Sequence, residues 1–404
     1  MQDLPAPDFV AIDTPVSPPE LELQSESESQ TGSETHPFSF TGTTRGYFGI
    51  WIVNLFLTII TLGIYSAWAK VRKKRYFYGH TYVAGANFEY HGNPIAILKG
   101  RVIALVLFGG YSAINYFTPL LVPYLAFVLF AAAPWFIGLS MAFNAYNSSY
   151  RNIRFCFRAS YREVFATIWP LMVFLIMALL IPEIDPKSKT PPPASFWVVH
   201  VLNLIFVVAV YPFVLGSIKR LHVSHSQFGT SAFKTDVQIK AFFKIYAKTL
   251  GLGLLGIVFL GAIAALAMPL LAMTNKGAIN GWSFLVVPVI VIAYVFGMAL
   301  LLAYTKSRIG NLMFNESRLN SRVSFSSTQQ VWKLTRIYVV NIFAILLSFG
   351  LAVPWAVIRT MRYRAECLNL QCSSSLDDFV GGVQAQVGAT GEEFGEFLNI
   401  DLSL

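Results

Sequence analysis

Polar side chains inside long apolar segments are the first residues in this sequence that could do chemistry. They are Asn54, Asn115, His200, Asn203 and Asn341. Amide and ionisable groups are costly at membrane depth, so they mark candidate intramembrane polar sites. Asn54 and Asn341 lead the set, because they occupy matching positions in two similar segments. They either line a polar cavity between repeats, as the half-helices of transporters do, or hydrogen-bond neighbouring helices as packing contacts.

His200 and Asn203 lie three residues apart and therefore share one face of a helix. They complete the candidate intramembrane site. The alternative places His200 near the outer interface of the membrane.

A run of cations beside aromatic residues is the clearest interaction feature. The candidate contacts with anionic lipid are Lys70, Arg72, Lys73, Lys74, Arg75, Arg359 and Arg362. Aromatic neighbours such as Trp68 and Tyr76 suit a membrane interface, where each cation near an anionic surface contributes on the order of 1 kcal/mol. The run either anchors the topology or forms a specific site for a phospholipid headgroup.

The sequence predicts neither an enzyme nor a cofactor site. It has no P-loop, nucleophile elbow, HExxH or dinucleotide-binding glycine motif. His222 and His225 have metal-like spacing, but Lys219 and Arg220 beside them oppose a cation, so no metal site is predicted. Glu163 is one of few acids among cations, and we expect it to be ion-paired rather than catalytic.

Composition and charge indicate a polytopic membrane protein. Of 404 residues, 55% are hydrophobic and only 13% are charged. All 30 Lys and Arg lie between Phe38 and Cys372, and 14 of the 21 acidic residues lie outside those limits. The cations flank apolar segments, which favours the anionic headgroups of the cytoplasmic leaflet over nucleic acid as partner. We expect a disordered acidic tail over 1–37, a transmembrane domain over 38–372 and an acidic cytoplasmic tail over 373–404.

Eight apolar segments determine the predicted topology. They cover residues 47–68, 97–117, 119–141, 164–182, 196–217, 245–273, 281–304 and 337–358. The positive-inside rule places both termini in the cytoplasm and makes the six middle segments full crossings. The first and last segments carry cations at both ends, so we expect each to break, near Gly63 and Gly350, and return without crossing. Eight plain crossings are the alternative.

Internal repeats support this plan. The first and last segments align without a gap, which superposes Asn54 on Asn341, Gly63 on Gly350 and Arg72 on Arg359. Short stretches with alternating aromatic residues follow several segments, at 80–90, 147–157, 225–233 and 315–325, and 80–90 needs an extra residue to align. They read as strands that pair into a small cytoplasmic layer, or as separate interfacial loops. The predicted fold class is therefore an all-α membrane protein with internal repeats and short strands between helix pairs.

Two strings carry a resemblance to a known family. TLGIYSAWAKVRKKRYFYGHT and FEYHGNPIAILKGR resemble the YjgN/DUF898 family of bacterial inner-membrane proteins, as does VGATGEEFGEFL near the C-terminus. The resemblance runs from about Phe38 onward. It implies a multi-pass location in the plasma membrane of a Gram-negative bacterium, and it implies no mechanism.

Two classes of function follow from these patterns. The first is binding or passage of a small solute or lipid without nucleotide hydrolysis. The second is a membrane scaffold or stress-response factor that binds protein partners at the cytoplasmic face. The oligomeric state is left open.

Overall fold

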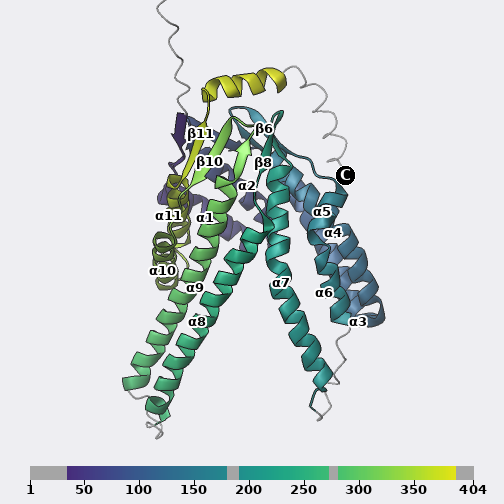
Figure 1. The fold of residues 1–404 in the computed structure, drawn as a ribbon, viewed down its shortest axis with the longest axis vertical. Coiled ribbons are helices and arrows are strands. Elements are labelled where there is room, and N and C mark those ends of the chain that lie inside the picture. Colours follow the sequence, from purple (N-terminus) through teal and green to yellow (C-terminus); the bar gives the residue numbers. More distant parts are fainter. Residues whose placement is uncertain (1–33, 180–190, 273–280, 388–404) are drawn as a thin grey trace, which may run out of the picture. The chain divides into compact units, whose positions relative to one another are not determined.

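An antiparallel sheet of 11 short strands organises the chain. The computed structural model describes residues 34–179, 191–272 and 281–387. The strands are β1 (Glu34–Pro37), β2 (Ser39–Phe40), β3 (Thr81–Val83), β4 (Ala86–Tyr90), β5 (Ser148–Tyr150), β6 (Ile153–Phe157), β7 (Ser226–Phe228), β8 (Ser231–Thr235), β9 (Ser317–Leu319), β10 (Val323–Ser327) and β11 (Leu368–Cys372). Strands β2 to β11 are neighbours in chain order, and β1 lies beside β11 (Figure 1).

Residues 34–40 join the two ends of this sheet. Strand β1 pairs with β11, and β2 pairs with β3 at the opposite end. Only Phe38 separates β1 from β2, and its backbone N–H donates to the carbonyl of Leu368 at 3.0 Å. The sheet is therefore nearly a closed barrel. Closure removes the unpaired edges that make open sheets prone to aggregation.

Tight turns connect the strand hairpins. Ala84 and Gly85 form the β3–β4 turn, and Arg151 and Asn152 form the β5–β6 turn, all with positive φ. Two consecutive residues with positive φ are typical of the type I′ turn, whose twist matches that of the paired strands. The sequence alignment placed an extra residue in 80–90, but the longer turn is the one between β9 and β10, over residues 320–322.

Five helical units leave the sheet and return to it. Their helices are α1 (Thr44–Ile60) and α2 (Ser66–Gly79); α3 (Pro94–Phe117), the 3-10 turn η1 (Pro119–Leu121) and α4 (Val122–Tyr146); α5 (Tyr161–Ile168), α6 (Pro170–Leu179) and α7 (Ala194–Ser224); α8 (Ile239–Ala272) and α9 (Gly281–Asn315); and α10 (Val331–Leu347) and α11 (Val353–Glu366). Successive helices contact one another, and α11 contacts α1. Below the sheet, the helices thus form a closed ring.

The predicted all-α class with six full crossings is wrong on two counts. The strands do pair, as one of the two interpretations held, but they form one large sheet and not a small accessory layer. Within the described residues, five helices are long and apolar enough to cross a membrane: α3, α4 with η1, α7, α8 and α9. The expected crossing over 164–182 is divided at Trp169 between α5 and α6, and its last residues, 180–182, lie outside the described residues.

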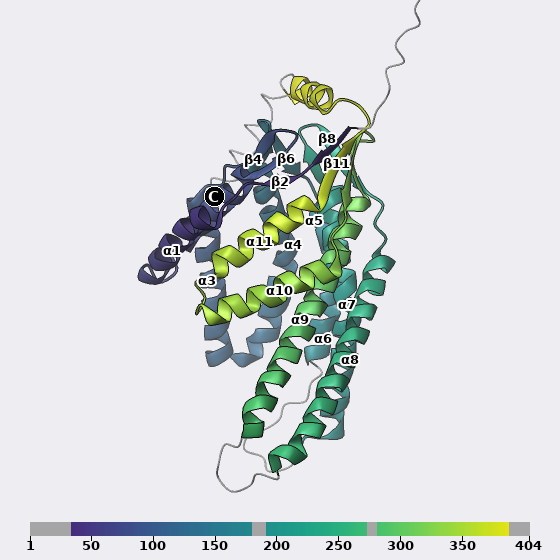
Figure 2. The ribbon, with the colours of Figure 1, turned by 90° about the vertical axis from the view of Figure 1, so that its left-hand side faces the viewer.

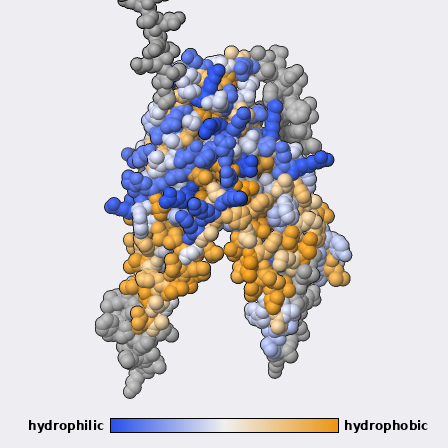
Figure 3. Space-filling model, viewed as in Figure 1, coloured by the Kyte–Doolittle hydropathy of each residue, from blue (hydrophilic) through white to orange (hydrophobic). Residues whose placement is uncertain are grey.

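The long helices expose apolar side chains. None of the residues in the most apolar windows of α3 and α8 is buried inside the protein. Figure 3 shows this apolar surface below a hydrophilic upper part. Near the sheet, α7 and α8 touch where Gly216 meets the ring of Phe242, and farther away they diverge (Figure 1). Such surfaces suit a surrounding of lipid.

The helix breaks expected near Gly63 and Gly350 are present. Leu62 and Gly63 have φ of 50° and 94°, and Phe349 and Gly350 have φ of 49° and 91°. These left-handed residues end α1 and α10 and turn the chain back toward the sheet as α2 and α11. Figure 2 shows α10 and α11 lying side by side.

Equivalent tyrosines close the two hairpins near the sheet. The Tyr76 hydroxyl accepts from the backbone N–H of Thr43 and donates to its carbonyl, both at 2.9 Å. The Tyr363 hydroxyl does the same with Gln330, at 2.8 and 3.3 Å. The contacts are the same in both hairpins, in the register that superposes Asn54 on Asn341, so the two hairpins are structural repeats.

A helix over residues 376–387 lies across the turn side of the sheet (Figure 2). Its apolar residues join a core drawn from strands all around the sheet: Phe38, Val83, Tyr150, Ile153, Phe228, Leu319, Val323, Leu370, Cys372, Leu376, Phe379, Val380 and Val383. Polar contacts fix both ends of the helix. Arg151 pairs with Asp377 at 2.5 Å, and Thr230 donates to Gln386 at 2.6 Å.

Candidate functional site

Cations surround the protein where the helices meet the sheet, and we call this set the basic belt. On α2 and α11 it contains the seven sequence-predicted lipid contacts. Of these, Lys74 and Arg359 are half-buried, and the others are exposed. The remaining units add Lys99, Arg101, Arg162, Arg220, Lys240, Lys244, Lys248, Lys306, Arg308, Lys333 and Arg336. Figure 3 shows the hydrophilic band directly above the apolar helices.

The chain order explains why the belt forms. Every helical unit begins and ends at the sheet, so the basic linkers between apolar segments all fall at one level. Counting cations by linker was therefore sufficient to find the belt, although it did not find which side chains face inward.

Lys74 is a half-buried residue of the belt with two contacts of its ammonium group. Its ammonium donates to Asn144 of α4 at 2.5 Å and lies 4.5 Å from the centre of the Tyr90 ring. Burial, together with the charge of Lys70, lowers the pKa of Lys74. This side chain points away from the lipid-facing surface and ties α2 to α4.

Asn54 and Asn341 each hydrogen-bond within their own hairpin. The Asn54 amide oxygen accepts from Arg72 at 3.5 Å. The Asn341 amide nitrogen donates to the Ala356 carbonyl and to the Thr360 hydroxyl, each at 3.1 Å. Both side chains are buried, and their bonds fasten the two arms of each hairpin.

The repeat is not symmetrical at these asparagines. Arg72 bonds Asn54, whereas Arg359, its equivalent, lies over the Trp355 ring at 5.1 Å. The Nη1 atom of Arg359 and the Oδ1 atom of Asn341 are both buried without a hydrogen-bond partner among the described residues. The second hairpin thus has a buried donor and a buried acceptor without partners, whereas the equivalent groups of the first hairpin bond each other.

His200 and Asn203 lie on α7, which packs against α5, α6 and α8. His200 is exposed, and its Nδ1 faces the Phe196 carbonyl at 2.8 Å. Asn203 is buried, and its amide oxygen is without a partner in the described part of the chain. The bonds of Asn54 and Asn341 lie in other helices, so the four predicted polar residues do not share one set of contacts.

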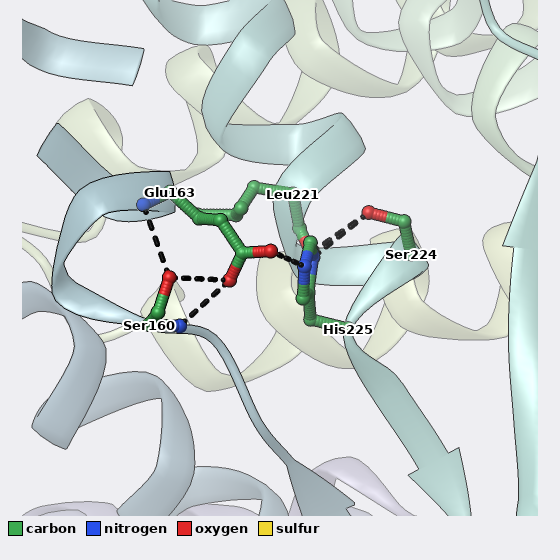
Figure 4. A network of polar contacts seen from close by, with 5 residues as sticks. All are labelled: Ser160, Glu163, Leu221, Ser224 and His225. Atoms are coloured by element: carbon green, nitrogen blue, oxygen red, sulfur yellow. Dashed lines mark hydrogen bonds and ion pairs between the residues drawn. The ribbon is translucent and has the colours of Figure 1, made fainter. Parts of the chain in front are cut away.

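A polar network that sequence patterns did not reveal joins α5 to α7 (Figure 4). Ser160 and Glu163 form a capping box at the start of α5. Glu163 also pairs with Nε2 of His225 at 3.0 Å, while Nδ1 of His225 faces the Leu221 carbonyl at 3.1 Å. The partner of Glu163 is thus a histidine, which forms an ion pair with it only when protonated.

This network is structural. Bonds from the Ser160 backbone and hydroxyl, followed by the contact with His225, lower the pKa of Glu163 to about 2. A carboxyl group so acidic stays ionised at neutral pH and is a poor proton donor. Both nitrogens of His225 already face oxygen atoms. No group of three or more metal-binding side chains occurs in the described ranges.

An open hollow of about 480 Å³ lies in the belt beside α7 and α8. Arg220, Asp236 and Lys240 contribute its charged side chains, and the start of α8 forms part of its wall. Its two cations exceed its one carboxylate, so the hollow favours an anion over a cation.

Comparison with known proteins places the chain in a family. The family model described as "Bacterial protein of unknown function (DUF898)" matches residues 35–397. The protein named "Inner membrane protein YjgN" of Salmonella typhimurium strain LT2 is 25% identical over 370 residues, covering 86% of this chain and 91% of the relative. The protein of the same name from Escherichia coli K12 is 25% identical over 374 residues, covering 85% and 90%. No solved structure matches. With its apolar helices and these relatives, this chain is an integral membrane protein that belongs to the DUF898 family.

Proposed function

We propose that this protein binds anionic phospholipid headgroups at the basic belt. One observation carries the proposal: the exposed belt cations of α2 and α11 have no carboxylate partner in the described part of the chain. The ion pairs found there join Glu34 to His36, Glu89 to His91, Glu163 to His225 and Asp377 to Arg151. The positive charge of the belt is therefore free to attract phosphate.

The position of the belt supports lipid as the source of that phosphate. The cations lie at the level where apolar helix surface gives way to polar surface, which is the level of headgroups in a bilayer. The inner leaflet of bacteria and its anionic lipids fit the positive-inside rule, so we place the sheet and both ends of the described chain in the cytoplasm.

The strength of binding follows from the number of exposed cations. Lys70, Arg72, Lys73 and Arg75 on α2 and Arg362 on α11 give five, at about 1 kcal/mol each near an anionic surface. Helices α11 and α1 touch, so α2 and α11 belong to neighbouring hairpins. Their cations then act on one patch of membrane.

Photochemical crosslinking tests the proposal. The protein is reconstituted with phosphatidylglycerol carrying a photoreactive headgroup, and crosslinked peptides are identified by mass spectrometry. We expect labelling of 66–79 and 353–366, with strong competition by unlabelled phosphatidylglycerol and weak competition by phosphatidylcholine. Lys70→Gln, Lys73→Gln and Arg75→Gln together should reduce labelling at least tenfold.

A control substitution distinguishes the loss of a belt cation from the loss of one positive charge elsewhere on the protein. Arg322 is exposed in the β9–β10 turn, on the side of the sheet away from the helices. Arg322→Gln should leave labelling unchanged, whereas Arg75→Gln should reduce it. Equal labelling in wild type and the triple variant, or equal competition by the two lipids, contradicts the proposal.

A further inference from the structure

The two repeated hairpins differ at the residue that precedes their second helix. Tyr65 is the N-cap of α2, and Ala352 is the N-cap of α11. The gapless register of the repeat superposes these two positions. Their backbone N–H groups donate to equivalent hydroxyls, that of Thr61 at 2.9 Å and that of Ser348 at 2.8 Å. The backbone contacts are therefore the same in both hairpins, and the side chain of the N-cap residue is what differs.

Tyr65 determines where the arginine of the first hairpin lies. Its ring stacks on Trp68, with 6.1 Å between the ring centres and 12° between the planes. Its hydroxyl accepts from Nη1 of Arg72 at 3.1 Å, and the same nitrogen donates to Asn54 at 3.5 Å. The tyrosine ring thus covers the tryptophan, and its hydroxyl helps to hold Arg72 against Asn54.

Ala352 supplies neither contact in the second hairpin, because it has no ring and no hydroxyl. Arg359 lies over Trp355 instead, with its Cζ atom 5.1 Å from the ring centre. Its Nη1 atom is buried without a partner among the described residues, as is Oδ1 of Asn341, a residue only 6% exposed. Arg359 therefore covers the tryptophan as Tyr65 does in the first hairpin, and it gives up the bond to asparagine that Arg72 makes.

Arg359 has donors to offer a ligand. In the described part of the chain it makes no ion pair, and it is half-buried, so part of its side chain reaches the surface. A guanidinium group stacked on an aromatic ring keeps its charge and the donors in its plane. Those donors match the paired oxygens of a phosphate, and stacking fixes their direction in advance. Arg359 is thus oriented to bind an oxygen anion before the anion arrives.

The hairpin tip indicates that the phosphate belongs to a lipid. Leu347 and Phe349 at the tip are 80% and 98% exposed. On the opposite side of Arg359 along α11, one turn closer to the sheet, lies the exposed cation Arg362. A phospholipid held at Arg359 can lay its acyl chains along the apolar tip, whereas a free phosphate gains nothing from that surface.

We propose that Arg359, stacked on Trp355, binds the phosphate of one anionic phospholipid, while its repeat equivalent Arg72 is held by Tyr65 and Asn54 in a structural role. The inference rests on the function proposed above, because the belt attracts the lipid to the hairpins. It adds the residue that makes the specific bond and the substitution between the repeats that leaves this residue available.

The crosslinking experiment with photoreactive phosphatidylglycerol tests the assignment when the two labelled peptides are compared in the same sample. The readout is the ratio of labelling in 353–366 to labelling in 66–79, which cancels changes in the total amount of bound lipid. Arg359→Lys keeps the charge but loses the planar, stacked donors. It should lower the ratio severalfold by reducing labelling of 353–366 alone.

Exchange of the N-cap residues is the sharper test. Ala352→Tyr gives the second hairpin the ring and hydroxyl of the first, so Arg359 should turn to Asn341 and labelling of 353–366 should fall severalfold. Tyr65→Ala should free Arg72 to lie over Trp68 and raise labelling of 66–79 severalfold, with 353–366 unchanged. The φ of Ala352 is −80°, which a tyrosine adopts without strain. If Ala352→Tyr does not fold, Tyr65→Ala and Arg359→Lys decide.

The outcomes separate this assignment from the function on which it rests. Arg322→Gln, on the far side of the sheet, should leave the ratio unchanged. Labelling of both peptides with the expected lipid preference, but with the wild-type ratio in Arg359→Lys and in the exchange variants, overturns this assignment alone. No labelling, or equal competition by both lipids, overturns the proposed function and this assignment with it. Loss of labelling in 353–366 on addition of soluble glycerol 3-phosphate would assign the site to a free phosphate and overturn its assignment to lipid.

Discussion

Deletion of residues 1–40 is expected to open the ring, whereas deletion of residues 1–33 is expected to leave it closed. The shorter deletion keeps every strand pair of the described sheet. The longer one removes β1 and β2, and with them the partners of β11 and β3. It also removes Phe38 and Phe40, which are 9% and 6% exposed. Burial of two such side chains contributes about 3–6 kcal/mol.

Size-exclusion chromatography and thermal unfolding of the two truncated proteins measure this effect. The protein without residues 1–33 should elute as one species with the wild-type melting temperature. The protein without residues 1–40 should aggregate or melt well below it, because β3 and β11 become free edges. Identical elution and melting of the two proteins would show that residues 34–40 do not close the sheet.

Gly229→Val is expected to release helix 376–387 from the sheet. Gly229 has φ of +55°, and a Cβ atom there would lie 2.6 Å from Val383 and 2.9 Å from Val387. The left-handed backbone costs a non-glycine residue about 1–2 kcal/mol, and overpacking adds about 1–3 kcal/mol. Together these terms compete with docking of a helix that is only three turns long.

Hydrogen exchange followed by mass spectrometry reports the release. Amides in 376–387 should exchange much faster in Gly229→Val than in wild type, with little change in the long helices. Gly251→Val is the matched control, because a Cβ atom at Gly251 on α8 would meet open space. Normal protection of 376–387 in Gly229→Val would mean that the helix does not dock through this turn.

Local patterns predicted much of this fold. Glycine in a left-handed turn, at Gly63 and Gly350, is a constraint of the backbone itself, so it is visible in sequence and present in the structure. The gapless register between the first and last segments also pairs Tyr76 with Tyr363, which make matching contacts in the structure. The distribution of cations over the linkers located the basic belt.

Closure of the sheet was not predictable in the same way. Each strand has two to five residues, too few for a clear alternation, and the deciding pairs join residues near 35 to residues near 370. Such distant pairing depends on the whole fold and leaves no local signal. The number of crossings was wrong because a count of apolar residues does not show that the segment over 164–182 is divided at Trp169 into two short helices.

The surroundings of the polar side chains were not predictable from the sequence either. Sequence spacing placed Lys219 and Arg220 in one cluster, but Lys219 is half-buried and Arg220 is exposed. The asparagines, chosen for their depth, make bonds within their hairpins, and their role in ligand binding remains a prediction. Glu163 and His225 lie on separate helices, so only the fold brings them to 3.0 Å.

Native mass spectrometry of the protein extracted with its surrounding membrane tests the binding of anionic lipid by the basic belt most directly. Wild-type protein should retain phosphatidylglycerol or another anionic phospholipid in preference to phosphatidylethanolamine. A variant with Lys70, Lys73 and Arg75 all changed to Gln should lose that preference while remaining folded. Retention of zwitterionic lipid by wild type, or the same anionic lipid content in both proteins, would contradict the account.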